Sequence, residues 1–267
     1  MEQGRAFDAA RLTLITLDKA LVVDAFYARV AHKLAADSTI ADDLFALAVR
    51  MRLGNFFEPA LMQVVDLHSA TERVRSTTGL LLQSEFPFGL KILLEGYLQA
   101  GSAQNDVSYL AWLVSARVRF TLVDLDFAPF AEVFVDIASG DDDATDGKVR
   151  AFDTLFASNH KFYGEADFFL NLPKDTAQRG LLDLGATLGS KIGDTVTATL
   201  AFHAFLPQEG RGQSDPLGME LDVLFGWKPE RHIAFDLCYA GFFPGDGMGV
   251  SDAAIEHLIY TTATASF

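Results

Sequence analysis

Arginines at alternate positions in apolar segments are the residues of this sequence best placed to do chemistry. Arg50 with Arg52, and Arg117 with Arg119, each flank one apolar residue, so in an extended strand both side chains of a pair point the same way. A planar guanidinium group binds a carboxylate through two parallel hydrogen bonds. The spacing therefore predicts a surface that binds anionic groups.

The charged residues of the strand-like segments form two sets along the chain. The basic set lies in the N-terminal half: Arg11, Arg50, Arg52, Arg75, Lys91, Arg117 and Arg119. The acidic set lies in the C-terminal half: Glu132, Asp136, Asp183, Glu220, Asp222 and Asp236. Two such walls facing a water-filled interior create a transverse field that can select ions. The competing interpretation is that the charges simply neutralise one another.

Metal and catalytic sites are weaker candidates. Asp141, Asp143 and Asp146 in "GDDDATDG" have the composition of a hard-cation site, but the spacing of an EF-hand is missing, so a solvated acidic loop and no metal are favoured. The sequence contains neither HExxH nor GxSxG. Ser190 and His203 are expected on neighbouring strands but near opposite rims. We therefore expect no enzyme and no cofactor.

The elements that position these residues are strands, because apolar and polar residues alternate in segments of about ten residues. Helical periodicity is scarce. We expect strands at 9–17, 21–31, 43–53, 59–66, 74–86, 90–100, 107–122, 128–139, 180–189, 195–206, 217–227, 231–243 and 256–267.

The connections between the expected strands alternate in length. Tight turns such as "LDKA" and "FPFG" alternate with longer connections that include "DLHSATER", "AGSAQND" and an outer loop at about 140–178. Short turns on one rim and long loops on the other are typical of outer-membrane barrels. We predict an all-β fold: an antiparallel up-and-down transmembrane β-barrel of about 12 to 14 strands, forming one domain over residues 1–267. Phe267 would lie on the rim of short turns.

The two faces of the expected strands fit that barrel. In "LGMELDVLFGW", Met219 and Val223 share a face that lipid can contact, whereas Glu220 and Asp222 share the face turned to water. Setting the apolar faces outward places both charged sets in the lumen. Trp227 and Tyr260 are expected near a membrane interface. A soluble β-sandwich that binds carbohydrate has alternating strands too and is one alternative. An outer-membrane barrel enzyme is the other.

Composition limits the classes of partner. The 267 residues are 50% hydrophobic and carry a formal net charge of −15, which disfavours nucleic acid. Lipid is the expected partner of the outer face. The sequence has no apolar run of about 18 residues that would predict a transmembrane helix. One cysteine, Cys238, excludes an internal disulfide.

The segment "NHKFYG" in the longest loop offers a second group of binding residues. Phe162 and Tyr163 could stack on sugar rings, and His160 and Lys161 could hold a carboxylate. The alternative is that these side chains anchor the loop.

Several motifs, taken in order, resemble one known family. The segments "ASGDDD", "FDTLFASNHKFYG" and "FFPGD", with "RAFDAARL" and "VDAFYAR" near the start, are similar to the alginate export family of outer-membrane barrels. The similarity extends over most of the chain. It implies a porin-like channel in the outer membrane of a Gram-negative bacterium. The channel would export or take up sugar polymers or other small solutes, anionic ones included.

The resemblance also implies that the chain corresponds to the C-terminal part of a larger barrel. Our expected strands are odd in number, whereas bacterial single-chain barrels have even numbers of strands. We therefore expect an incomplete barrel with two unpaired edges.

Overall fold

The computed structural model describes residues 6–31, 42–155, 157, 159–160, 162–210, 215–249 and 254–266. Expectations for Lys161 and Phe267 lie outside these residues. The long strands are β1 (Ala6–Thr16), β2 (Leu21–Ala31), β3 (Asp42–Met51), β4 (Phe57–His68), β5 (Arg73–Glu85), β6 (Leu90–Ala103), β7 (Val107–Thr121), β8 (Phe130–Ala138), β10 (Leu181–Ile192), β11 (Val196–Leu206), β12 (Gly218–Glu230), β13 (Ile233–Pro244) and β14 (Glu256–Ala265). The short elements are η1 (Ser69–Thr71), β9 (Lys148–Val149), α1 (Leu172–Asp175) and η2 (Asp246–Met248).

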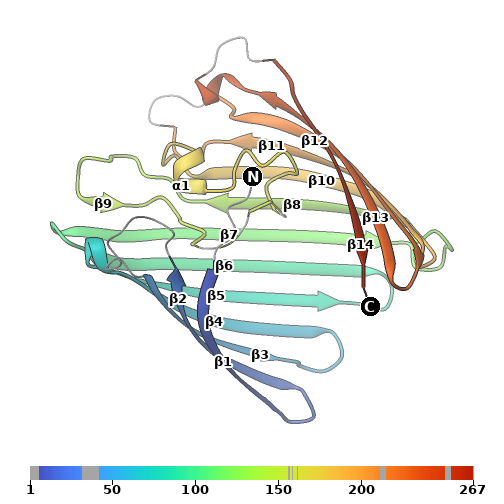
Figure 1. Ribbon diagram of the computed structural model, residues 1–267, viewed down its shortest axis with the longest axis horizontal. Helices are drawn as coiled ribbons and strands as arrows, with labels where there is room; N and C mark the ends of the chain where they lie inside the picture. The colour runs from blue at the N-terminus through green and yellow to red at the C-terminus, as the bar shows by residue number, and fades with distance from the viewer. Residues whose placement is uncertain are drawn as a thin grey trace. The chain divides into compact units, whose positions relative to one another are not determined.

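The strands form an antiparallel up-and-down sheet in chain order. The path runs from β1 to β8 and on from β10 to β14, and β9 pairs with β7 outside this path. Figure 1 shows β10 to β14, yellow to red, following one another in this order. The all-β prediction is confirmed, and the two stacked sheets of a β-sandwich are not present in the described residues. In those residues β1 and β14 end the path without pairing with each other, so the sheet is not closed.

Alternation of side chains along the strands separates two faces. In β12, Met219, Val223 and Trp227 are exposed, whereas Glu220 and Asp222 are buried. Paired residues of neighbouring strands project to the same side, so the register carries this division along β1 to β5 and, separately, along β8 and β10 to β14. We call the face bearing Glu220 and Asp222 the inner face and the exposed apolar face the outer face.

The predicted strand boundaries lie within three residues of the observed ones. Two connections expected to be long are short, because β4 extends to His68 and β6 extends to Ala103, leaving only η1 and a tight turn between strands. Ser, Thr, Asn and Gly mark a turn in sequence, but they do not show how far cross-strand pairing continues into it. The difference in loop length between the rims is therefore smaller than predicted.

By its internal contacts the chain divides into two compact units. The N-terminal unit comprises Met1–Ser84, Leu94–Leu113 and Asp143–Arg150. The C-terminal unit comprises Glu85–Leu93, Val114–Asp142 and Ala151–Phe267. The predicted outer loop at 140–178 is divided between the two units and contains β9 and α1.

Residues 151–178, which we call the inner loop, belong to the C-terminal unit. The loop ends in α1, where Asn171 Oδ1 caps the first turn by accepting a hydrogen bond from the Lys174 N–H at 3.2 Å. Leu172 and Phe169 are fully buried. The loop therefore has a core of its own against the strands. Among the described residues, no helix is long and apolar enough to cross a membrane.

Candidate functional site

The predicted lumen residues lie on the inner face of their units. In the N-terminal unit, Arg11 is opposite Phe26, Arg50 is opposite Val22, and Arg75 is opposite Asp66. The register then places these three arginines on one side of the sheet. In the C-terminal unit the inner-face residues include Arg119, Glu132, Asp136, Asp183, Glu220, Asp222 and Asp236.

Most of the predicted basic residues form ion pairs with nearby carboxylates. Arg11 lies 2.8 Å from Asp24. The other pairs are Arg52 with Glu58 at 2.8 Å, Lys91 with Glu85 at 2.8 Å, Arg119 with Glu132 at 2.9 Å, and Arg117 with Asp136. The expected field between one basic and one acidic wall stays a prediction, and these pairs would weaken it. The competing interpretation, local neutralisation, describes these pairs.

Several acidic partners were missed in the sequence, namely Asp24, Glu58, Asp66 and Glu85. Hairpin register was the signal that could have found one of them, since Arg75 directly opposes Asp66 across the β4–β5 hairpin. Such a pair is predictable once the turn between two strands is placed correctly.

The arginines of three inner-face pairs are more exposed to solvent than their carboxylate partners. The side-chain exposures are 63% for Arg11 against 23% for Asp24 and 36% for Arg119 against 13% for Glu132. The corresponding values for Arg52 and Glu58 are 61% and 32%. A guanidinium group has five N–H donors, and a carboxylate partner uses at most a few of them. Each pair therefore presents spare cationic donors to the solvent.

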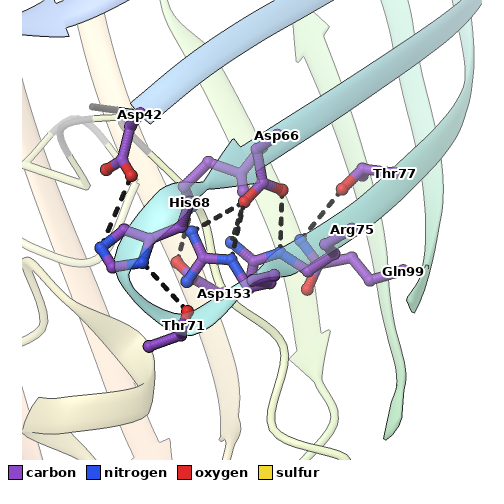
Figure 2. Close-up of polar contacts among 10 residues, drawn as sticks. Asp42, Asp66, His68, Thr71, Arg75, Thr77, Gln99 and Asp153 are labelled. Atoms are coloured by element: carbon purple, nitrogen blue, oxygen red, sulfur yellow. Dashed lines mark hydrogen bonds and ion pairs between the residues drawn. The ribbon is translucent and has the colours of Figure 1, made fainter. Parts of the chain in front are cut away.

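Arg75 is different, because it is buried in a hydrogen-bonded network on the inner face (Figure 2). Its Nε donates to Asp66 Oδ2 at 2.9 Å, and Arg73 Nε donates to Asp66 Oδ1 at 3.0 Å. Nearby, Gln99 Nε2 donates to the Thr77 hydroxyl at 3.1 Å. Arg75 was predicted to line the lumen, but burial prevents it from reaching a solute, and its role is structural.

A group of buried carboxyl groups lies on the inner face of β10 and β12. Asp183, Glu220 and Asp222 are each almost fully buried. The nearest basic group is His203 on β11, which lies 2.9 Å from Asp183 and 3.9 Å from Asp222. Asp183 also opposes Asp136 across the β8–β10 pair. The sequence predicted their orientation, but not their burial.

The inner loop covers this acidic group. The Ala166 N–H donates to Glu220 Oε1 at 2.7 Å, and the Tyr260 hydroxyl donates to Glu165 at 2.6 Å. The loop residue Phe168 stacks on Phe242 with ring centroids 3.9 Å apart. Tyr260 was expected at a membrane interface, but it is on the inner face and fastens the loop.

The candidate loop residues have mostly structural surroundings. His160 lies 2.6 Å from Asp167 and 3.1 Å from Glu165, so two carboxylates already occupy its ring nitrogens. Tyr163 is buried, so its ring cannot stack on a sugar. Phe162 is exposed and lies over the Arg117 guanidinium, 5.9 Å from ring centroid to Cζ. The surroundings of His160 and Tyr163 fit side chains that anchor the loop, whereas the Phe162 ring is accessible to solvent.

The acidic "GDDDATDG" stretch is held by its own hydrogen bonds. Asp143 Oδ1 accepts from the Thr145 N–H at 2.9 Å. The Arg150 guanidinium, 2.7 Å from Asp146, holds the pKa of that carboxyl group below its usual range. Asp141 is buried. In the part of the chain that the structure describes, no group of three His, Cys, Asp or Glu side chains is arranged to hold a metal ion.

Ser190 and His203 do not form a nucleophile and base pair. Ser190 opposes Ala198 and His203 opposes Gly185, so the two side chains lie on opposite faces of the β10–β11 pair. The Ser190 hydroxyl donates to the Phe127 carbonyl at 2.5 Å. This geometry gives no support to hydrolytic chemistry at these residues.

An up-and-down antiparallel sheet with an apolar outer face and a charged inner face is typical of an outer-membrane β-barrel protein. The family model described as Alginate export matches residues 19–259. The chain therefore belongs to the alginate export family, whose members are transport channels in the outer membrane of Gram-negative bacteria.

A solved structure has a similar fold. The crystal structure of a doubly substituted OccD1 (OprD) matches with a TM-score of 0.57 and 12% sequence identity, covering 95% of this chain and 68% of that chain. At this identity the similarity concerns the fold. A search of curated proteins found no match.

Proposed function

We propose that this outer-membrane channel conducts anionic solutes, with carboxylated sugars and their oligomers as the preferred class. The observation that carries the proposal is the exposure of Arg11, Arg52 and Arg119 beyond their carboxylate partners on the inner face. A permeating carboxylate can accept hydrogen bonds from the spare guanidinium donors without breaking the resident ion pairs. Arg50, which is exposed on the same face as Arg11, adds a further cation.

The geometry near Arg119 and Arg117 supports a sugar as the carrier of that carboxylate. Arg119 lies over the Phe130 ring at 4.3 Å, and Arg117 lies 5.9 Å from the centroid of the exposed Phe162 ring, whereas the Phe134 ring, 4.5 Å from Arg117, is buried. Phe130 and Phe162 are the rings beside these two arginines that solvent reaches. Aromatic rings pack against the apolar faces of sugars, while guanidinium groups bind their carboxylates.

Ion selectivity in planar bilayers tests the proposal. Substituting Arg11→Gln or Arg119→Gln removes one exposed inner-face cation, so the anion-to-cation permeability ratio is expected to fall by roughly two- to fivefold, about 0.4 to 1 kcal/mol. The ratio is measured from the reversal potential in a salt gradient. Uronate oligomers are expected to block the current of the wild-type channel more strongly than that of the Arg119→Gln variant.

Arg29→Gln is the matched control. Arg29 pairs with Asp43 at 2.9 Å and is 55% exposed, but it lies on the outer face, opposite Asp8 and one residue from the inner-face position Ala28. Its removal is expected to leave selectivity unchanged. Equal shifts in Arg11→Gln and Arg29→Gln would show that the inner-face arginines do not select anions.

A further inference from the structure

The acidic group beneath the inner loop contains more carboxyl groups than cations. Its carboxyl groups are Asp136, Asp183, Glu220 and Asp222, and the groups in it that can carry a positive charge are Arg117, which pairs with Asp136, and the His203 imidazole. All of these carboxyl groups are buried. An unneutralised carboxylate in such surroundings is costly, so a buried acidic pair ordinarily retains a proton.

Three carboxyl oxygens in this group have no hydrogen-bond partner among the described residues. They are Asp183 Oδ1, Glu220 Oε2 and Asp222 Oδ1. Glu220 and Asp222 occupy alternate positions of β12, so both side chains project to the inner face, where their carboxyl groups interact. Two carboxyl groups in this relation can share one proton, as an acid and its conjugate base.

The same carboxyl groups hold the inner loop. The Ala166 N–H donates to Glu220, and the adjacent Glu165 N–H faces both Glu220 and Asp222. Gly164 brings the backbone close, because its φ of +85° is left-handed and a Cβ there would lie 2.5 Å from the Glu220 carboxyl group. The loop residue Glu165 brings a further acidic group near the cluster.

We propose that Glu220, Asp222 and Asp183 form a proton-binding site that latches the inner loop to the inner face. In the protonated state the cluster carries little charge and the loop packs on it. Raising the pH ionises the cluster. Ionisation strengthens the hydrogen bonds from the loop N–H groups, but the cost of burying the carboxylates beneath the docked loop is the larger effect, and repulsion from Glu165 adds to it, so docking weakens as the pH rises. The channel interior then widens under alkaline conditions. This inference does not depend on which solute the channel conducts.

Other titratable and charged groups face the proton-binding site from the elements packed against it. They are His160, Glu165 and Asp167 of the inner loop, Arg117 of β7, Asp136 of β8, His203 of β11, Cys238 of β13 and Tyr260 of β14. Of these, only Arg117, His160 and His203 can carry a positive charge, and His160 is held by Glu165 and Asp167.

Cys238 provides a built-in reporter of loop docking. It is the single cysteine of the sequence, and it is buried. It opposes Tyr260 across the β13–β14 pair, and the Tyr260 hydroxyl donates to Glu165 of the loop. Release of the loop breaks the hydrogen bond between Tyr260 and Glu165, and we expect it to open Cys238 to a thiol reagent.

The experiment measures maleimide labelling of Cys238 in the folded protein in lipid vesicles, from about pH 5 to about pH 9, which spans carboxyl and imidazole titration in proteins. Glu220→Gln with Asp222→Asn mimics the protonated cluster and keeps the same cysteine. The wild-type rate, divided by the rate of this variant at the same pH, is expected to rise by about tenfold across the range. Single-channel conductance should increase over the same range in the wild type alone.

Asp194→Asn is the matched control, since Asp194 lies in the β10–β11 turn, paired with Lys191 at 2.8 Å and far along the strand from the cluster. It should keep the wild-type profile. If the double variant does not fold, Asp222→Asn alone is compared. A rate ratio that stays constant with pH overturns the proposal. In a second series, sodium is replaced by tetramethylammonium at each pH. A rate ratio that changes with sodium concentration rather than with pH also overturns the proposal.

Discussion

At the scale of single residues, burial decides what each arginine does. Arg11 and Arg75 both pair with an aspartate on a neighbouring strand, at 2.8 and 2.9 Å. Arg11 is largely exposed, whereas the Arg75 side chain is only 4% exposed. An exposed pair contributes little to stability, but removing one partner of a buried pair leaves an uncompensated charge. The Arg75 pair is therefore expected to matter for stability, whereas the Arg11 pair leaves its guanidinium group open to solvent.

Asp66→Ala is expected to destabilise the folded protein by about 3 to 5 kcal/mol. The substitution removes the carboxylate to which the Arg73 and Arg75 guanidinium groups donate, and it leaves the buried Arg75 charge of Figure 2 without this partner. The measurement is a urea titration of the protein in lipid vesicles, followed by the folded band in unheated gels. Asp24→Ala, which removes the partner of exposed Arg11, is the control and should leave the urea midpoint almost unchanged, because an exposed pair contributes little to stability. Equal losses in the two variants would contradict a structural role for Arg75.

At the scale of elements, the inner loop is fixed by two kinds of contact. Aromatic residues pack it against the strands, with Phe169 4.6 Å from Phe205 between ring centroids. Hydrogen bonds from its backbone and to its side chains join it to β12 and β14. The close approach of Gly164 to β12 makes the second set of contacts possible, since a side chain at this position has no room.

Gly164→Ala is expected to loosen the loop by about 1 to 3 kcal/mol, through both the left-handed backbone and the contact with Glu220. The measurement is the rate of Cys238 labelling at neutral pH, which should increase. Gly193→Ala isolates the backbone effect, because Gly193 also has a positive φ, +57°, but a Cβ there meets nothing within 4 Å. If Gly193→Ala raises the labelling rate as much, the contact between Gly164 and Glu220 does not hold the loop.

At the scale of the whole molecule, the apolar outer face makes lipid part of the folded state. Exposed large apolar side chains recur on the outer face of strand after strand, among them Leu110, Val133, Leu188 and Ile259. A water-soluble protein would not leave so many of them uncovered. In a bilayer the same side chains contact hydrocarbon, and the charged inner face stays hydrated.

Val133→Arg is expected to reduce the free energy of folding into bilayers by about 2 to 4 kcal/mol, since Val133 is 60% exposed near the centre of β8. Reversible folding into vesicles, monitored against urea, gives this value. Ile192→Arg is the control, because Ile192 is exposed at the end of β10 beside a turn, where about 0 to 1 kcal/mol is expected. A similar small cost at both positions would show that depth in the membrane does not matter and that the outer face is not lipid-facing.

The sequence by itself determined the strands, their order and their faces. Alternation is a local property with a period of two residues, so Glu220 and Asp222 on one face and Val223 on the other follow from spacing alone. Chain-order pairing then follows from short turns. The motifs from "ASGDDD" to "FFPGD" also indicated the family, which the match over residues 19–259 confirms.

Only the tertiary structure decided which charges are paired, buried or open to solvent. Tyr260 and Glu165 are 95 positions apart in the chain, and Ala166 and Glu220 are 54 apart, so no local pattern predicts their hydrogen bonds. The burial of Tyr163 and the two carboxylates around His160 likewise follow from where the inner loop packs. Contacts of this kind depend on the register of the strands and on the path of a loop. Both are set by the summed packing of distant residues rather than by the spacing of near ones.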